Sequence, residues 1–305
     1  MNLHRFLLAL PLLLLASLGH AAGVPLGPAV VVDAGQGLAW IAAPAGRIAA
    51  VDLANGTLRW NGPAQGHPLA RLEPGLLVAL QPDDTGVWPF AWVNPDTGAV
   101  GERFSASLPA DVLASLEALP NQRFEVFVRA VEGGVELHWF SQRWAFRGAK
   151  LEDDEGVIQR EGVVRVEAAA SRAYADASRP QRPRIDLAPG ERLAGISEVQ
   201  LRAADDRHVM HRSEVEDAVL GQRWRWQIDE RNGTRVASVT LAEAAAPWMI
   251  NGTQLLWVAR PLLIANESGE FIETPARLIA VGLADSEELW SVALRDPVFR
   301  GSMPP

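Results

Sequence analysis

The chain has 305 residues, of which 48% are hydrophobic and 21% charged, a composition typical of a folded globular protein. Acidic residues outnumber basic ones by 37 to 28, and the net charge of −9 argues against a surface that binds nucleic acid. The sequence contains no cysteine, which excludes disulfides, thiolate metal sites, cysteine nucleophiles and a lipid-modified N-terminal cysteine.

Residues 1–22 have the pattern of a cleaved secretory signal peptide. Arg5 supplies the positive charge, residues 6–18 are apolar, and Gly19 and Ala21 are the small residues that a signal peptidase reads. This apolar stretch is shorter than the roughly 20 residues that a membrane span requires. No other stretch is long enough, so we expect an exported, soluble, periplasmic protein with a single domain over residues 23–305 and no membrane span.

Short β-rich runs follow the signal peptide. Residues 29–33, 38–42, 47–53 and 57–60 favour strands, and Gly-rich turns separate them. None of these runs has the length or the 3.6-residue period of a helix. The sequence therefore predicts an antiparallel meander of four strands over residues 29–60.

The end of this meander recurs near the C-terminus. Residues 50–60 align without gaps on residues 280–290, with five of eleven positions identical. Weaker copies place turn residues at positions 98, 134, 190 and 233, so that successive turns lie 36 to 56 residues apart. The residues that define the repeat are Ala50, Asp52, Gly56, Trp60, Gly98, Trp139, Ala280, Leu283 and Trp290.

This spacing matches the blades of a β-propeller, which contain about 40–50 residues each. One four-stranded sheet buries neither face alone, whereas sheets stacked around an axis cover one another. We therefore expect an all-β fold, a propeller of six or seven four-stranded antiparallel blades; a β-sandwich is the alternative. One or two short helices are expected in insertions; the candidates are residues 107–119 and the segment after the capping box of Ser213 and Glu216.

The pattern Ala-Val-Asp-Leu-x-x-Gly-x-x-x-Trp at residues 50–60 resembles the repeat of the pyrroloquinoline quinone (PQQ)-like β-propeller superfamily, which includes quinoprotein alcohol dehydrogenases. The resemblance implies a blade and does not by itself imply a bound quinone. Many of those dehydrogenases carry an adjacent-cysteine disulfide and hold Ca²⁺ with acidic and amide side chains. Neither feature maps onto this sequence, so the resemblance favours a non-catalytic member.

Tryptophan and arginine alternate in one segment and suggest a binding surface. On a strand, Arg223 and Arg225 share one face while Trp224 and Trp226 share the other. Trp88 and Trp92 flank Pro89 and are further aromatic candidates. Such residues are common anchors at protein interfaces, although packing within a half-buried strand also explains them.

His208 and His211 are the only candidates for metal ligands, and they are weak ones. Residues three apart share a face on a helix but point to opposite faces on a strand. No nucleophile elbow, phosphate-binding loop or dinucleotide-binding glycine motif occurs, so catalytic residues cannot be named.

These observations favour a protein-binding or scaffolding module of the bacterial envelope, with an envelope protein as its partner and no cofactor. One alternative is a periplasmic oxidoreductase that depends on a metal or on PQQ with calcium. The other is a protein that binds or senses a small ligand.

Overall fold

The computed structural model describes residues 24–27, 29–81, 86–109, 112, 122–144, 157–176, 208–217, 221–241, 248–266 and 268–302. The predicted signal peptide, the turn at residue 190 and most of the helix expected over residues 107–119 therefore lie outside the described residues.

The described residues form antiparallel sheets, and in most of these sheets neighbouring strands are also consecutive in the chain. Sheet I contains β1 (Val24–Gly27), β2 (Val30–Asp33), β3 (Leu38–Ala42), β4 (Arg47–Asp52) and β5 (Leu58–Gln65), with a 3-10 turn, η1 (Pro44–Gly46), before β4. Sheet II contains β6 (His67–Leu72), β7 (Gly75–Ala79), β8 (Val87–Val93) and β9 (Val100–Ser107). Sheet III contains β10 (Gln122–Val131), β11 (Gly134–Trp144), β12 (Val157–Glu167) and β13 (Arg172–Asp176).

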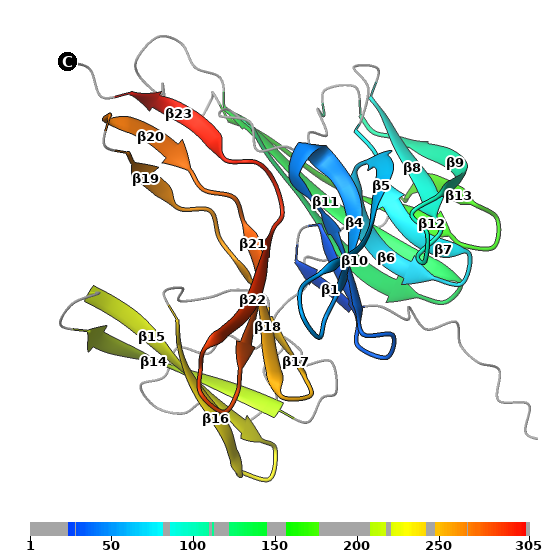
Figure 1. Cartoon of the computed structure of the whole chain (residues 1–305). Coiled ribbons are helices and arrows are strands. Elements are labelled where there is room, and N and C mark those ends of the chain that lie inside the picture. The colour runs from blue at the N-terminus through cyan, green and yellow to red at the C-terminus, as the bar shows by residue number, and fades with distance from the viewer. Residues whose placement is uncertain are drawn as a thin grey trace, which may run out of the picture.

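The C-terminal half continues in the same way. Sheet IV contains β14 (His208–Asp217), β15 (Gly221–Glu230) and β16 (Arg235–Leu241). Sheet V contains β17 (Trp248–Asn251), β18 (Gln254–Ala259), β21 (Arg277–Gly282) and β22 (Glu288–Ala293). Sheet VI contains β19 (Leu263–Ala265), β20 (Glu270–Glu273) and β23 (Val298–Ser302), which continue the strands of sheet V outward (Figure 1).

The predicted meander over residues 29–60 is confirmed, and side-chain alternation shows how its sheet is buried. In β3, Trp40 packs toward sheet II, whereas Ile41 packs toward sheet V. In β2, Val31 likewise points to sheet II, and its two valine neighbours point to sheet V. Because both faces are covered, the strands are continuous apolar runs without polar alternation.

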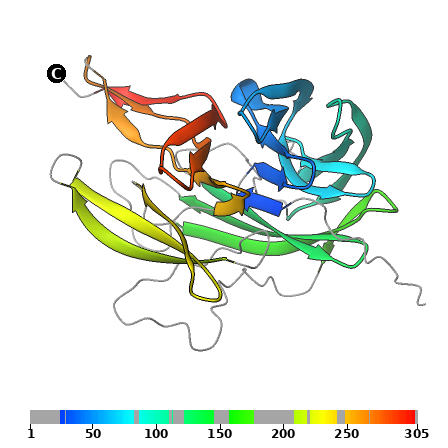
Figure 2. The same ribbon diagram turned by 60° about the horizontal axis from the view of Figure 1, so that its bottom comes forward.

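Four hydrophobic clusters give the order of the sheets in space. Separate clusters join sheets II and III, sheets I and II, sheets I and V, and sheets IV and V. The order is therefore III–II–I–V–IV, in which the first sheet of the chain packs against the last full one (Figures 1 and 2). This stacking of antiparallel meander sheets confirms the expected all-β class and is consistent with a propeller, although no hydrophobic cluster of the described residues joins sheet III to sheet IV to close a ring.

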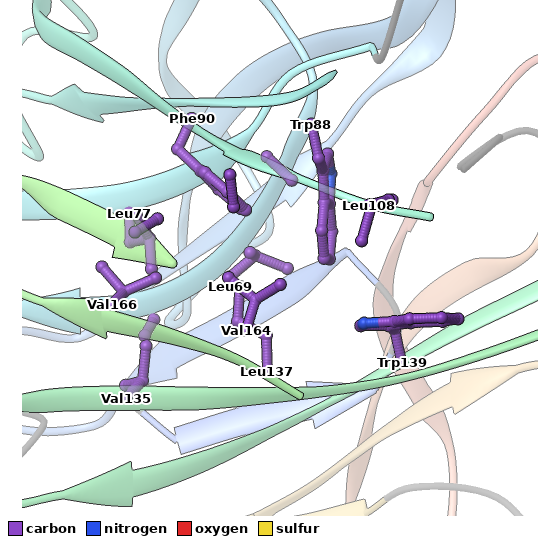
Figure 3. Packing of buried hydrophobic residues seen from close by; sticks show 14 of the residues in the cluster. Leu69, Leu77, Trp88, Phe90, Leu108, Val135, Leu137, Trp139, Val164 and Val166 are labelled. Carbon is purple, nitrogen blue, oxygen red and sulfur yellow. The ribbon is translucent and has the colours of Figure 1, made fainter. Parts of the chain in front are cut away.

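The cluster between sheets II and III is rich in aromatic rings. Figure 3 shows Trp88 and Phe90 of sheet II on the same side of the interface, facing Leu137 and Trp139 of sheet III. The ring centroids of Trp88 and Phe90 are 4.9 Å apart, a distance typical of favourable aromatic pairs. Burial of such side chains contributes about 1.5–3 kcal/mol each to folding.

Tryptophans of sheets V and I each link their sheet to a turn of the neighbouring sheet. The indole Nε1 of Trp290 in sheet V donates to the carbonyl of Leu53 at 3.1 Å, and its ring covers Gly56 of sheet I. Trp60 of sheet I donates to the Pro95 carbonyl at 2.9 Å and covers Gly98 of sheet II. A Cβ at either glycine would lie within 2.8 Å of the indole, so only glycine permits this contact.

The other two pairs of neighbouring sheets are linked through serine residues at the equivalent turns. Trp92 of sheet II donates to the hydroxyl of Ser171 in sheet III at 3.1 Å. Between sheets IV and V, the Ser286 hydroxyl donates to the Ser238 carbonyl at 2.8 Å. Ser171 and Ser286 both have positive φ, 45° and 65°, so serine occupies the left-handed position that glycine holds at residues 56 and 98.

Two expectations from the sequence are wrong. The helix expected after Ser213 is absent, because that residue lies in β14, which pairs along its whole length with β15. Trp139, predicted to define the repeat together with Trp60 and Trp290, does not lie in the last strand of its sheet as they do: it lies in β11, the second strand of sheet III, over Gly162. The glycine turn at residues 133–134 thus joins the first two strands of that sheet, and the turn equivalent to Gly56 lies at residues 168–171, where the sequence contains no glycine.

Five sheets of the described residues pack against one another; sheets II, III and V have four strands, sheet I has five and sheet IV has three. The expected six or seven blades are not reached within these residues.

Candidate functional site

Sheet IV is the last sheet in the described series. Its central strand β15 carries apolar side chains on one face and arginines on the other. Trp226 and Ile228 face sheet V and are buried, and Trp224 packs partly against the same cluster. Arg223 and Arg225 point to the opposite face, which we call the arginine face. None of the four hydrophobic clusters of described residues includes a side chain from this face.

The register of sheet IV defines what surrounds the two arginines. Arg225 lies directly opposite Ser213 of β14 and Thr240 of β16, and all three residues are exposed. Arg223 lies two residues away, a separation of about 7 Å along the strand. The face therefore presents two guanidinium groups next to two hydroxyl groups.

Neither arginine is neutralised within the part of the chain that the structure describes. Arg225 makes no ion pair there, and Arg223 makes none. The Nε atom of Arg223 is buried and has no hydrogen-bond acceptor. A buried donor without an acceptor is costly, typically about 1–3 kcal/mol, so an incoming acceptor would relieve this cost.

At the other end of the arginine face, the carboxylate of Asp229 already has partners within sheet IV. Its carboxylate accepts a hydrogen bond from Gln227 Nε2 at 2.7 Å and faces Arg235 Nε at 3.3 Å and His211 Nε2 at 3.6 Å. With this acid already satisfied, Arg223 and Arg225 remain as the part of the face able to bind an additional anion. Arginine is suited to bidentate binding of carboxylate or phosphate oxygens.

The other predicted aromatic candidates do not belong to this face. Trp88 and Trp92 are buried between sheets II and III, 0% and 5% exposed. Trp226 is buried as well, so the expectation that these three rings form a surface patch is wrong. The sequence cannot separate the two roles, because a large aromatic residue serves equally well in a core and at an interface.

The two histidines proposed as weak metal candidates do not converge. His208 and His211 lie on opposite faces of β14, since they are three residues apart on a strand. No group of three or more His, Asp or Glu side chains that could hold a metal ion occurs among the described residues.

Several members of the arginine face were missed in the sequence. Gln227 and Asp229 continue the alternation that starts at Arg223, so extending the period-2 pattern along β15 would have found them. Ser213, Thr240 and Arg235 depend on the register between strands and carry no sequence signal of their own.

Comparisons with known proteins add little to this geometry. No protein-family model and no curated protein matches the sequence. A solved quinohemoprotein alcohol dehydrogenase from Pseudomonas putida HK5 is similar at 10% identity and a TM-score of 0.23; the match covers 88% of this chain and 60% of that chain. A computationally designed protein, Ika8, matches at 8% identity and a TM-score of 0.25, covering 90% of this chain and 87% of that one.

The chain thus spans 60% of the length of the matched dehydrogenase. At these identities and TM-scores the matches support no conclusion about the fold, activity, cofactor or partner of this chain. Among the described residues, no helix has both the length and the apolar character needed to cross a membrane.

Proposed function

We propose that this protein is an exported, non-catalytic propeller of the PQQ-like type that binds an envelope protein through the arginine face of sheet IV. The segment recognised is acidic, with carboxylates spaced to meet Arg223 and Arg225. The proposal rests on one observation: the exposed Arg225 and the half-buried Arg223 lie on one face of a sheet whose other face is anchored by Trp226.

The local charge supports an acidic partner in spite of the chain's overall charge of −9. Asp229, an acid of this face, is already paired with His211 and Arg235. Ser213 and Thr240 add hydroxyl donors beside Arg225, and mixed guanidinium and hydroxyl donors suit carboxylate oxygens. The rigid sheet holds these donors in place before binding, which lowers the entropy cost of association.

Affinity purification with an arginine variant tests this function. The tagged mature protein and its Arg223→Ala/Arg225→Ala variant are recovered from the native envelope, and retained proteins are identified. The matched control is Arg47→Ala, which removes an exposed arginine from sheet I. We expect one protein to be retained by the wild type and the control but lost from the double variant. Equal retention by all three proteins would contradict the proposal.

A direct binding measurement sharpens the result. An acidic segment of the retained protein is synthesised, together with a copy in which glutamine and asparagine replace the acids. We expect the acidic peptide to bind the wild type at least 10-fold more tightly than the neutral copy, with an affinity that falls as salt rises. N-terminal sequencing of periplasmic protein, expected to begin at Ala22 or Gly23, tests the export that the proposal assumes.

A further inference from the structure

Sheet VI carries an exposed apolar face that is separate from the arginine face. Ile264 of β19, Ile272 of β20 and Phe299 of β23 are direct cross-strand neighbours and therefore point to the same side. Leu262 continues this side next to Thr274, with which it exchanges two hydrogen bonds. We call these four residues, Leu262, Ile264, Ile272 and Phe299, the apolar patch.

The exposure of the apolar patch is unusual for this molecule. Leu262, Ile264 and Phe299 are 55%, 47% and 60% exposed, and they are three of the seven large hydrophobic residues exposed among the described residues. The sheet that carries them lies beyond the ends of β18, β21 and β22, away from the packed sheets (Figure 1). Concentrated apolar exposure on a monomer surface often marks an interaction site.

The edges of sheet VI are protected, although its face is open. β19 has three residues and follows Pro261 closely, whereas β23 contains a bulge in which residue 300 has no partner on β20. Short edge strands, bulges and prolines are the devices by which proteins prevent pairing with a foreign strand. A partner is therefore expected to bind through side chains on the face and not by adding a strand.

The size of the apolar patch restricts its occupant. The exposed parts of its side chains amount to roughly 300 Å². A stable dimer of two identical chains requires about 800 Å² from each partner, so the patch cannot hold a second copy by itself. Three strands span about 10 Å, which matches the diameter of one α-helix with its side chains, about 10–12 Å.

Charge at one end of the patch adds a further requirement. Glu270 lies on the same side of β20 as Ile272, two residues away. Its carboxylate accepts a hydrogen bond from Asn266 Nδ2 at 2.6 Å, but it makes no ion pair within the part of the chain that the structure describes. An occupant with a lysine or arginine near this end would gain an ion pair.

From these observations we propose that the apolar patch binds one amphipathic α-helix of a partner protein. The helix carries apolar residues at positions i, i+3 or i+4, and i+7, and a basic residue beside Glu270. This is the helix-on-apolar-surface mode of recognition, with the packing of side chains on Phe299 and Ile264 as its main source of affinity.

Site-specific photocrosslinking tests this proposal in the native envelope. Phe299 is replaced by the photoreactive analogue p-benzoylphenylalanine, and the cross-linked peptides are identified by mass spectrometry. We expect one partner segment with the apolar spacing described above and a basic residue at one end. Cross-links only to lipid, to a second copy of this chain, to segments without that spacing, or to nothing would overturn the proposal.

Binding of the identified segment supplies the quantitative test. A synthetic copy of the segment is titrated against the wild type, Phe299→Ser and Leu289→Ser. Leu289 is a matched control because it is 49% exposed and lies on β22, outside the patch. We expect Phe299→Ser to weaken binding at least 10-fold and Leu289→Ser to leave it within 2-fold; equal affinities for all three proteins would refute helix binding at this face.

The result is independent of the function proposed for sheet IV. The Arg223→Ala/Arg225→Ala variant is expected to keep the cross-link from position 299, and Phe299→Ser is expected to keep the partner of the arginine face. Thermal unfolding midpoints within 2 °C of the wild type verify that each surface variant is folded.

Discussion

Sheets I and IV are both antiparallel meanders of hairpin-connected strands, but they differ in how many of their faces are buried. Sheet I lies between two neighbours, so consecutive residues such as Trp40 and Ile41 enter two different hydrophobic clusters. Sheet IV has a described neighbour on one side only, and its consecutive residues Arg225 and Trp226 divide between solvent and core. The apolar pattern of a strand therefore reports the position of its sheet in the series, and a sheet with an uncovered face can display binding groups on that face.

The largest losses of stability are expected when a buried side chain is removed from either face of sheet I. Trp40→Ala and Ile41→Ala each delete a side chain that is 0% exposed, and we expect losses of about 3–5 and 2–5 kcal/mol in the free energy of unfolding. Trp40 also loses its hydrogen bond from Nε1 to the Pro95 carbonyl, 3.0 Å long. Urea denaturation measures both losses. A cost below 1 kcal/mol for either variant would show that sheet I is covered on one face only.

The next prediction compares two glycine substitutions in order to separate the cost of lost tryptophan packing from the cost of backbone strain. Gly98 has a φ of +74°, and a Cβ there would lie 2.7 Å from the Trp60 ring; Gly37 has a φ of +66° and open space around it. We expect Gly98→Ala to cost about 2–4 kcal/mol, from overpacking and backbone strain together. Gly37→Ala, with backbone strain alone, is expected to cost about 1–2 kcal/mol. Equal unfolding midpoints for the two variants would contradict the close contact between Trp60 and Gly98.

These tryptophan–glycine contacts also mark how far the sequence predicts the fold. The matching segments at residues 50–60 and 280–290 both identify real turns, but only the first follows the rule that an indole covers a glycine, because Ser286 holds the left-handed position in the second. In sheet III the rule also fails: Ser171 occupies the left-handed position of the last turn, whereas the glycine turn at residues 133–134 joins β10 to β11. A repeat defined by residue identity loses a blade in which another residue adopts the same backbone conformation.

The candidate sites were less accessible to prediction than the fold. Alternation placed Arg223 and Arg225 on one face, but burial, which excludes Trp88 and Trp92, depends on neighbouring sheets far away in sequence. The apolar patch of sheet VI gave no signal, because Ile264 and Phe299 are 35 residues apart (299 minus 264) and become neighbours only through the register of β19, β20 and β23.

The free energy of unfolding is also expected to depend on pH, because His67 is shielded from solvent. Burial lowers the pKa of His67, the first residue of β6, to about 4, below the 6.5 of an exposed histidine. The unfolded chain binds this proton below pH 6.5, whereas the folded protein does not until about pH 4, so the free energy of unfolding falls as pH decreases through this window. We expect a loss of about 1–3 kcal/mol, flattening below pH 4.

The His67→Gln variant isolates this contribution, because glutamine does not titrate. Unfolding free energies at pH 7.0, 5.5 and 4.5 are compared for the two proteins. We expect the wild type to lose more stability than the variant between the first and the last pH. Parallel curves would show that His67 is not shielded from solvent in the folded protein.

The smallest effect is expected on the open face of sheet IV, and it is the one that bears on function. Arg225→Ala removes an exposed side chain without an ion pair among the described residues, so the free energy of unfolding should change by less than about 0.5 kcal/mol. Trp226→Ala, one residue away but 2% exposed, should cost about 3–5 kcal/mol. If Arg225→Ala were also strongly destabilising, the arginine would be part of the packing of sheet IV, and the face could not be free to receive an acidic partner.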